Sequence, residues 1–475
     1  MSDNDIRTQL FIGGEWVESD ESFPVVNPYD ESELAPVSAA GPEHLEQAVR
    51  AAAASGMEDL TAHRRYLVLD EVSRRIKDER EKLTSLIVRE AGKPVRYAAG
   101  EVERAVQTFS FAAGEARRLH GSTMELDAHP EGKDHFAFYH RFPLGIIGAI
   151  SPFNFPLNLV AHKVAPALAA GNSVILKPAS TTPLVALELA RIISDAGAPP
   201  GAINVLPGSG SKLGSPLVEH PDVAMITFTG SLEVGRRIRR DAGMKRVTLE
   251  LGSNSALIVD DDSRLDEAVS RSIIGAFAYS GQVCISIQRI LLRSSLAGRF
   301  IEQFVPAVEK IRAGDPADQA TELGPMIEEA EARRAQEWVD EAVAQGASVL
   351  TGGRRDGAFY SPTVLEDVEH DMKVYSSEVF APVVCIERYD DFDDALERVN
   401  NSEYGLQAGV YTSSLPRAME AFRRLEVGGV MINDFPTYRV DQMPYGGVKG
   451  SGTGREGPKF AVEDMTELKL CVFNN

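Results

Sequence analysis

The sequence is poor in cysteine, with only three thiols among 475 residues. Cys284, Cys385 and Cys471 are too few and too far apart for a disulfide framework or a cysteine-based metal site. Residues 1–5 are acidic and lack the basic and apolar regions of a signal peptide. We therefore expect a cytoplasmic location, free thiols and no bound metal.

Long apolar runs and an excess of positive charge are also missing. No segment approaches the roughly 20 consecutive apolar residues that a membrane-spanning helix needs. Acidic residues outnumber basic ones by 70 to 49, which gives a net charge of -21. Because this charge repels nucleic acid and anionic lipid, we expect neither nucleic acid nor membrane as a partner.

A chain of this length is too long for one hydrophobic core, so two or three domains are expected. Between residues 145 and 251, short apolar segments alternate with amphipathic ones, and a second alternating set covers 255–431. This β-α-β order predicts doubly wound parallel sheets of the nucleotide-binding type. The segments 121–142 and 466–473 alternate like strands. They either reach a neighbouring subunit or complete a local sheet.

Cys284 is the most informative single residue, in the segment GQVCISIQR at 281–289. A thiolate is a strong nucleophile at neutral pH, but most buried cysteines only fill space. Five other motifs accompany it in the chain. They are SPFNFP (151–156), GNSVILKPAS (171–180), FTGSLEVG (228–235), LELG (249–252) and EVFAP (378–382).

Together these motifs resemble the aldehyde dehydrogenase superfamily, and the resemblance runs from FIGGEW (11–16) to PYGGVKGSG (444–452). The segment 284–289, taken with 438–441, is most similar to the branch of lactaldehyde and non-phosphorylating glyceraldehyde-3-phosphate dehydrogenases. The resemblance implies an α/β fold with a Rossmann-like cofactor domain, an α/β catalytic domain and a small β oligomerisation domain. It also implies a homodimer or homotetramer.

The implied domain boundaries follow the motifs. The dinucleotide-binding domain takes residues 1–120 and 143–252, and the catalytic domain takes 253–440. The oligomerisation hairpin and tail take 121–142 and 460–475.

The resemblance assigns three catalytic roles. Cys284 is the nucleophile that attacks the aldehyde carbon. Asn154 donates to the developing oxyanion together with the Cys284 backbone N–H, and Glu250 activates the water that hydrolyses the thioester. Taken alone, Asn154 could be a helix cap and Glu250 a surface acid. Members that pass the acyl group to coenzyme A usually lack this glutamate, so hydrolysis to a free acid is favoured.

The cofactor implied is NAD or NADP. The residues that match the family's cofactor-binding positions are Ser151, Phe153, Lys177, Ser180, Gly230, Ser231, Gly235, Leu251, Glu378 and Phe380. Ser180 stands where many NAD-preferring members carry a glutamate that would repel a 2′-phosphate, which predicts a modest preference for NADP. Lys212 could meet that phosphate, or it could be a solvated surface lysine. Ser253 replaces the second glycine of the family's Glu-Leu-Gly-Gly.

The substrate side carries polar residues. Asn158 and His162 lie four apart, so a helix over 157–170 puts them on one face, and Arg439 could clamp an anionic group. We expect oxidation of a short polar aldehyde, hydroxylated or anionic, to its carboxylic acid through a thiohemiacetal and a thioester. Alternatively, Arg439 pairs with Asp441 or another acid and His162 is a satisfied core histidine.

Two further functions stay open at this point. The enzyme could act on plain aliphatic aldehydes or semialdehydes. In a different class, the chain could be a non-catalytic nucleotide-binding or structural member of the family, although the joint presence of the three catalytic residues speaks against it.

Overall fold

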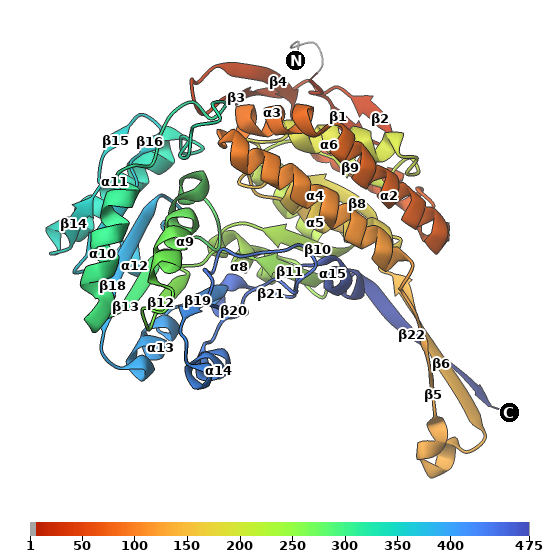
Figure 1. Cartoon of the computed structure of the whole chain (residues 1–475). Coiled ribbons are helices and arrows are strands. Elements are labelled where there is room, and N and C mark those ends of the chain that lie inside the picture. Colours follow the sequence, from red (N-terminus) through yellow and green to blue (C-terminus); the bar gives the residue numbers. More distant parts are fainter. Residues whose placement is uncertain (1–5, 475) are drawn as a thin grey trace.

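The structure, a computed structural model, describes residues 6–474, so the acidic segment 1–5 lies outside the described residues. Two α/β bodies stand side by side, and a narrow three-stranded arm projects from the larger one (Figure 1). Among residues 6–474, no helix combines the length and the apolar character that crossing a bilayer requires.

The larger body is built on an eight-stranded sheet of order β2-β1-β9-β8-β7-β10-β11-β21. Its strands are β1 (Leu10–Ile12), β2 (Glu15–Val17), β7 (Ile146–Ile150), β8 (Ser173–Lys177), β9 (Ile203–Val205), β10 (Val223–Thr229), β11 (Arg246–Glu250) and β21 (Gly452–Thr453). The strands from β9 to β11 pair in parallel. The predicted doubly wound sheet is confirmed, and an antiparallel strand closes each side.

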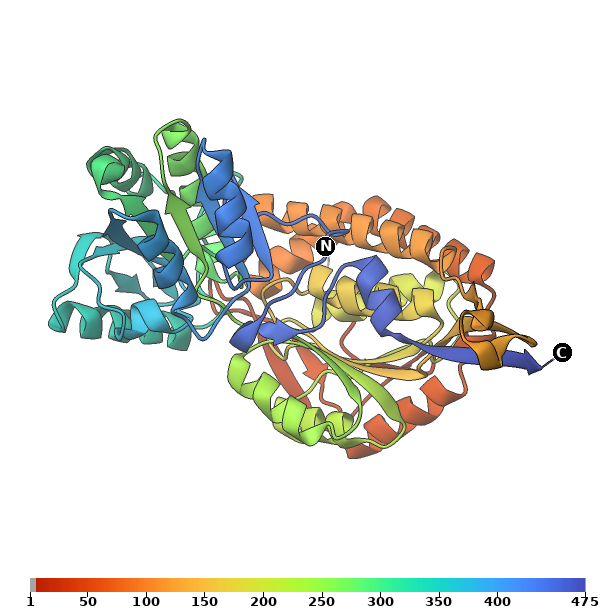
Figure 2. The same ribbon diagram turned by 90° about the horizontal axis from the view of Figure 1, so that it is seen from below.

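Helices cover both faces of this sheet (Figure 2). They are α1 (Pro42–Ala53), α2 (Ala62–Asp78), α3 (Arg80–Ala91), α4 (Val95–Ala116), α5 (Asn158–Ala170), α6 (Leu184–Asp195), α7 (Ser215–Glu219), α8 (Leu232–Asp241) and α15 (Pro458–Asp464). Every residue of α5 is buried, because α5 lies between the sheet and the outer helices α2 and α4. A helix that is apolar nearly all round is typical of such an internal position. The short hairpin β3 (Ser22–Val26) and β4 (Glu33–Ser38) lies at the N-terminal edge.

Two helix boundaries shape this body. The chain bends between α2 and α3 at Glu79, whose carboxylate pairs with Arg191 of α6. The tail was expected to start at residue 460, but α15 packs against α5 and α4 of the larger body. The extended tail therefore starts at Thr466.

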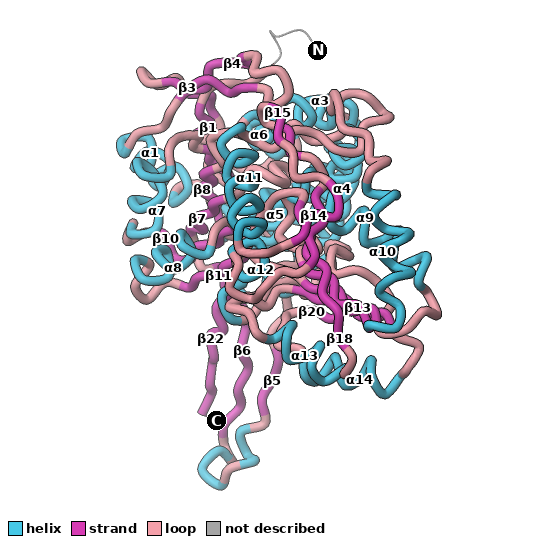
Figure 3. The backbone as a smooth tube through the Cα atoms, turned by 90° about the vertical axis from the view of Figure 1, so that its left-hand side faces the viewer, coloured by secondary structure: helices cyan, strands magenta, loops and turns pink. Residues whose placement is uncertain are grey.

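The smaller body is built on a seven-stranded sheet of order β14-β17-β18-β13-β12-β19-β20. Its strands are β12 (Ala256–Val259), β13 (Arg289–Arg293), β14 (Ser348–Thr351), β17 (Thr363–Glu366), β18 (Val383–Tyr389), β19 (Gln407–Tyr411) and β20 (Gly429–Ile432). Its helices are α9 (Leu265–Phe277), α10 (Ser294–Val308), α11 (Glu329–Ala344), α12 (Lys373–Ser376), α13 (Phe392–Asn400) and α14 (Leu415–Arg424). A two-stranded ribbon, β15 (Arg355–Asp356) and β16 (Phe359–Tyr360), lies beside α11. Figure 3 shows both bodies from the side of this sheet.

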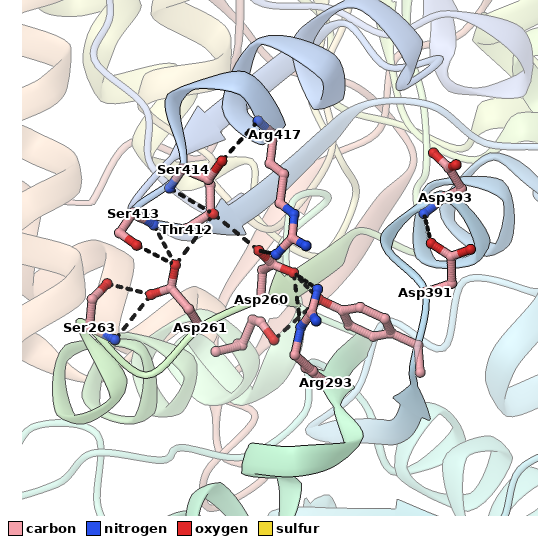
Figure 4. A network of polar contacts seen from close by, with 12 residues as sticks. Asp260, Asp261, Ser263, Arg293, Asp391, Asp393, Thr412, Ser413, Ser414 and Arg417 are labelled. Atoms are coloured by element: carbon pink, nitrogen blue, oxygen red, sulfur yellow. Dashed lines mark hydrogen bonds and ion pairs between the residues drawn. The ribbon is translucent and has the colours of Figure 1, made fainter.

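A buried carboxylate ties the strand ends of the smaller body together (Figure 4). Asp260, which follows β12, accepts hydrogen bonds from Arg293 and Arg417, both at 2.6 Å, and from Thr412 at 3.1 Å. Tyr389 donates to it at 3.1 Å. These partners follow or belong to β13, β18 and β19, so one ionised group fixes the carboxyl edge of four neighbouring strands. Such a charge is tolerated in the interior because it is fully paired.

The arm consists of β5 (Ser122–Met124), β6 (His135–Pro143) and β22 (Thr466–Asn474), with β6 in the centre. The expected hairpin and tail strand thus join in one sheet of their own chain. The arm keeps many large apolar side chains exposed. They are Met124, Phe136, Phe138, Phe142, Leu468, Leu470, Val472 and Phe473. Three strands with apolar side chains exposed in this number are typical of a surface that another protein covers.

Candidate active site

The chain reaches Cys284 through a strained turn. After α9 ends, Tyr279, Ser280 and Gly281 all adopt positive φ angles of 49°, 55° and 69°. Consecutive non-glycine residues in the left-handed region cost free energy and persist only when their surroundings hold them. A Cβ on Gly281 would lie 2.2 Å from the Ala381 carbonyl oxygen, so only glycine fits there.

Two hydrogen bonds hold this turn in place. The Tyr279 hydroxyl donates to the Ala91 carbonyl at 2.7 Å, and the Ser280 hydroxyl donates to the Gly324 carbonyl at 2.6 Å. Both acceptors belong to segments far away in the sequence. These bonds therefore hold the loop that carries Cys284, which precedes β13, next to the larger body.

Cys284 lines a cavity of about 470 Å³ between the two bodies. Its Sγ lies 2.8 Å from the hydroxyl oxygen of Tyr445. Loss of solvent around the thiol raises its pKa to about 11, although the Tyr445 hydrogen bond opposes the rise. The free thiol is thus mostly protonated at neutral pH. Cys385 is buried and Cys471 lies on the arm, so neither belongs to this cavity.

Asn154 lines the same cavity and is tied to the cysteine loop. Its Nδ2 donates to the Gln282 carbonyl at 2.9 Å, which uses one of its two N–H groups. The other N–H can point at an oxygen on the reacting carbon. Within residues 6–474, the backbone N–H of Cys284 also has no acceptor. The two expected oxyanion donors therefore both have a free N–H.

A buried ion pair supports the Asn154 loop. Lys93 pairs with Glu101, and both are fully buried. Lys93 also donates to the Asn154 carbonyl at 2.6 Å, while Glu101 accepts from the Leu157 and Asn158 N–H groups at 2.9 and 3.1 Å. A negative charge on the first N–H groups of α5 is favourable, so this pair fixes both the loop and the helix that follows it.

Glu250 ends β11 and lines the cavity with Cys284. Both of its carboxylate oxygens are buried without a hydrogen-bond partner in the described chain. Burial, and then the nearby Glu456 carboxylate, raise the pKa of Glu250 well above its usual value. A carboxyl with a raised pKa and free oxygens can bind water and take a proton from it.

Glu456 is the buried counter-ion behind this site, and the sequence reasoning missed it. It accepts from Lys163 of α5 at 3.1 Å and from Arg439 at 2.9 Å. These two cations outweigh burial and lower the pKa of Glu456 to about 2. The Gly-x-x-x-Glu-Gly spacing near the C-terminus gave no signal that this acid would come to lie beside Glu250.

The cofactor-side residues lie in two adjoining cavities that share Phe228. The first contains Cys284, and the second, of about 270 Å³, contains Lys177. Ser151, Phe153, Gly230, Ser231, Leu251, Glu378 and Phe380 all line the first cavity. Ser231 caps α8 by accepting from the Val234 N–H at 3.4 Å. Gly235 is buried, and a Cβ there would meet the Leu251 side chain at 2.6 Å.

These cavities fit a dinucleotide. The Ser151 hydroxyl is buried beside Cys284 without a partner, so it is free to bond a ligand. The N-terminus of α8 opens into the first cavity, and helix N-termini bind phosphate groups. Burial lowers the pKa of Lys177 to about 8, and its Nζ donates to the Gly208 carbonyl at 3.1 Å.

The Glu378 loop is held by the cysteine motif itself. Gln288, four residues after Cys284, donates to the Ser377 carbonyl at 2.7 Å and accepts from the Val379 N–H at 3.0 Å. Glu378 in turn accepts from the Ser253 N–H at 3.0 Å. Ser253 has no positive φ, so serine replaces the expected glycine without backbone strain.

Ser180 and Lys212, the two residues considered for contact with a 2′-phosphate, lie in different surroundings. The Ser180 hydroxyl donates to the Gly208 carbonyl at 2.9 Å, beside Lys177. Lys212 points to the surface and pairs with Glu21 at 2.6 Å. The structure therefore agrees with the interpretation of Lys212 as a surface lysine. It gives no support to the alternative that Lys212 meets a 2′-phosphate.

The substrate-side residues are occupied by acids of the chain. Asn158 and His162 both contact Oδ1 of Asp441, at 3.1 and 2.9 Å. Arg439 pairs with Glu456, and its side chain is only 5% exposed. This pairing matches the alternative in which Arg439 meets Asp441 or another acid, and the acid is Glu456.

His162 matches the alternative of a buried histidine bonded through Nε2, although its Nδ1 has no partner in the described chain. Burial and the Arg439 charge lower the pKa of His162, so it is neutral at pH 7.

Sequence reasoning also missed Arg104 on α4. Its Nη2 donates to Asp441 at 2.9 Å, and its side chain is 27% exposed. Nothing around residue 104 suggested a functional role, because the contact joins positions 337 residues apart.

Comparisons with known proteins agree with this geometry. Residues 16–471 match the family model described as the aldehyde dehydrogenase family. The 3-sulfolactaldehyde dehydrogenase of Priestia megaterium is 46% identical over 465 residues, which cover 98% of each chain. The lactaldehyde dehydrogenase of Methanococcus aeolicus is 38% identical, over 98% of this chain and 100% of that protein.

A solved structure is also similar. The glyceraldehyde-3-phosphate dehydrogenase of Methanocaldococcus jannaschii, complexed with NADP, superimposes with a TM-score of 0.92 and 39% identity. The match covers 96% of this chain and 100% of that chain.

The raised pKa of Cys284 predicts how fast the thiol reacts with an alkylating agent. Because the thiolate is the reactive form, we expect the rate of Cys284 alkylation by iodoacetamide in the ligand-free protein to keep rising up to pH 9.5. The rate is measured by mass spectrometry of the peptide that contains Cys284. A plateau between pH 7 and 8 would contradict the pKa of about 11.

Proposed function

The chain belongs to the aldehyde dehydrogenase family and is an enzyme acting on aldehydes, and we propose that it oxidises a short polar aldehyde to the free acid. The observation that carries the mechanism is the meeting of Cys284, Asn154 and Glu250 around one cavity. Each comes from a different part of the chain, and each supplies one function that the reaction needs.

The proposed reaction starts at Cys284. Its thiolate attacks the aldehyde carbon, a C–S bond forms, and the carbonyl electron pair moves to oxygen. Asn154 Nδ2 and the Cys284 N–H donate to this oxyanion, and removing one such donor costs roughly 3–4 kcal/mol of transition-state stabilisation. Bound NAD or NADP supplies the hydride acceptor. The remaining thioester is then hydrolysed by water that Glu250 deprotonates, which releases the acid and restores the thiolate.

We propose NADP as the preferred cofactor, with NAD accepted. Ser180 is small and neutral and donates to the same Gly208 carbonyl as Lys177, so no carboxylate at position 180 would repel a 2′-phosphate. Arg237 and Asp241 of α8 both line the second cavity, so their opposite charges offset each other there. The similarity to a structure complexed with NADP supports this preference.

We propose that the substrate is hydroxylated or anionic. Arg104 pairs with Asp441 and Arg439 pairs with Glu456, and the side chain of Arg104 is 27% exposed, so its guanidinium can meet an anionic group. Asp441 has a lowered pKa because His162 and Arg104 donate to it, which keeps it charged. The name of the similar 3-sulfolactaldehyde dehydrogenase points to the same class of substrate.

Arg104 and Arg439 differ in the N–H groups that they leave free for a substrate. Arg104 is partly exposed and uses only Nε and Nη2 on Asp441. Arg439 keeps a buried Nε without a partner in the described chain. We propose that Arg104 contacts the anionic end of the substrate and that Arg439 adds charge and one N–H behind it. Asn158 and His162 hold Asp441, and thereby Arg104, in position.

We further propose that the protein forms a homo-oligomer through its arm, as a homodimer or homotetramer. Paired residues of β6 and β22 share a face, and neighbouring pairs alternate between the two faces. Phe136, Phe138 and Phe473 therefore lie on one face of the arm, and Leu468 and Leu470 lie on the other. A second copy of the chain would cover these faces.

Replacing the base tests the hydrolysis step. We expect Glu250→Gln to form the thioester and then stall, because the amide cannot deprotonate water. Stopped-flow absorbance should show a burst of about one reduced cofactor per site, followed by a steady rate lower by roughly 10²–10⁴-fold. Glu233→Gln, an exposed residue of α8, is the matched control. Normal steady-state turnover by Glu250→Gln would reject the role of Glu250.

A panel of aldehydes tests the substrate class. Plain, hydroxylated and anionic aldehydes are compared with NAD and with NADP. We expect Arg104→Gln to lower kcat/KM for anionic aldehydes by roughly tenfold or more, as the loss of a charged hydrogen bond does. Neutral aldehydes should change much less. The control is Arg96→Gln, since Arg96 is exposed on the same helix.

Two results of the panel would contradict the proposal. Equal losses for all aldehydes would reject the anion contact. Wild-type turnover only with plain aldehydes would reject the polar substrate altogether, and equal or better turnover with NAD would reject the preference for NADP.

Charged residues on the arm test the assembly. We expect Leu468→Glu with Leu470→Glu to lower the mass measured by light scattering coupled to size-exclusion chromatography, because charges do not pack in an apolar interface. Met244→Glu changes a fully exposed methionine on the larger body and should leave the mass unchanged. An unaltered assembly in the double variant would show that the arm is not the interface.

A further inference from the structure

The hydroxyl of Tyr445 lies within hydrogen-bond distance of the proposed nucleophile. The hydroxyl oxygen lies 2.8 Å from Sγ of Cys284, and within residues 6–474 no other side chain makes a hydrogen bond to that sulfur. We propose that Tyr445 is a catalytic residue that donates its O–H to the Cys284 thiolate, both before attack and when the thiolate leaves. This inference rests on the proposed role of Cys284.

The direction of the hydrogen bond depends on the state of the sulfur. A thiol can donate to the tyrosine oxygen or accept from its O–H, whereas a thiolate can only accept. A donor at this position therefore stabilises the charged form more than the neutral form, and such a bond lowers the pKa of the thiol. The effect is needed here, since loss of solvent favours the uncharged thiol.

Tyr445 keeps its proton across the working range of pH. The residue is only 2% exposed. Burial, and then the neighbouring Cys284, raise the pKa of its hydroxyl well above the usual value. The phenol is thus a permanent hydrogen-bond donor and not a competing base. No proton has to leave it at any step.

Arg439 holds the tyrosine ring and adds charge to it. The guanidinium carbon lies 3.6 Å from the centre of the Tyr445 ring, within the range of a cation–π contact. Glu456 fixes the same guanidinium from the other side at 2.9 Å. A cation on the ring withdraws electron density from the phenol, so its O–H is a better donor. Arg439 is therefore a positioning residue for Tyr445.

The hydrogen bond has a defined role in two steps. Before attack, the Tyr445 O–H stabilises the thiolate form of Cys284. An electron pair of this thiolate then forms the C–S bond. During hydrolysis the C–S bond breaks and its electron pair returns to sulfur. The O–H then stabilises the departing thiolate, and proton transfer stays with water and Glu250.

Removing only the hydroxyl tests the proposal. Tyr445→Phe keeps the ring and its contact with Arg439. If the hydrogen bond lowers the thiol pKa by about one unit, its loss leaves about tenfold less thiolate below the pKa. Each remaining thiolate is more nucleophilic by about threefold, because nucleophilicity rises with pKa. We therefore expect Cys284 to be alkylated by iodoacetamide about threefold more slowly at pH 8, measured on its own peptide.

A second tyrosine provides the matched control. Tyr360 is also buried, and its hydroxyl has no partner in the described chain. It lies on β16, away from the cavity with Cys284. Tyr360→Phe should leave the alkylation rate unchanged, while both variants should melt within a few degrees of the wild type.

The outcomes separate this inference from the proposed function. An unchanged alkylation rate in Tyr445→Phe, or an equal loss in Tyr360→Phe, would overturn the role of Tyr445. A slower rate in Tyr445→Phe alone supports it, and the loss should then be similar at pH 7 and pH 9, because both lie below the thiol pKa of about 11. Because alkylation needs no aldehyde, it reports on Tyr445 even if a Cys284→Ser variant still turned over and the proposed nucleophile were wrong.

Discussion

The ion pair between Arg439 and Glu456 is the contact on which the rest of the site depends. Glu456 also pairs with Lys163 of the buried helix α5 and contributes to the raised pKa of Glu250. Arg439 lies against the Tyr445 ring, and Tyr445 reaches Cys284. A charge pair taken out of water is costly unless each member is well bonded. Glu456 is held by both Lys163 and Arg439, and the Arg439–Glu456 pair connects the proposed base to the proposed nucleophile.

Much of this arrangement could be predicted from the sequence. The apolar β-α-β pattern predicted both parallel sheets, because buried strands read as short apolar runs. The motifs around Cys284, Asn154 and Glu250 predicted residues that the fold does bring around one cavity. The resemblance to the aldehyde dehydrogenase family was enough for these, since it assigned each role to a residue of one short motif.

The charged network could not be predicted, because its contacts join distant positions. Lys163 and Glu456 are 293 residues apart, and Arg104 and Asp441 are 337 apart. A sequence shows that an arginine such as Arg439 is present but not which acid it will meet. The bend at Glu79 contains neither proline nor glycine, and the Glu79 carboxylate meets Arg191 of α6, which is 112 residues away.

Residues near the C-terminal end of the sequence complete the sheet and the helix layer of the larger body. Its sheet starts at β1 near residue 10 and is closed by β21 at 452–453, and α15 then packs on α5. During synthesis, the N-terminal half therefore emerges from the ribosome with one sheet edge unpaired and one helix surface bare. It must wait for the whole catalytic domain to be translated. A truncated or stalled chain would expose that edge, and chaperones rather than native contacts would have to protect it.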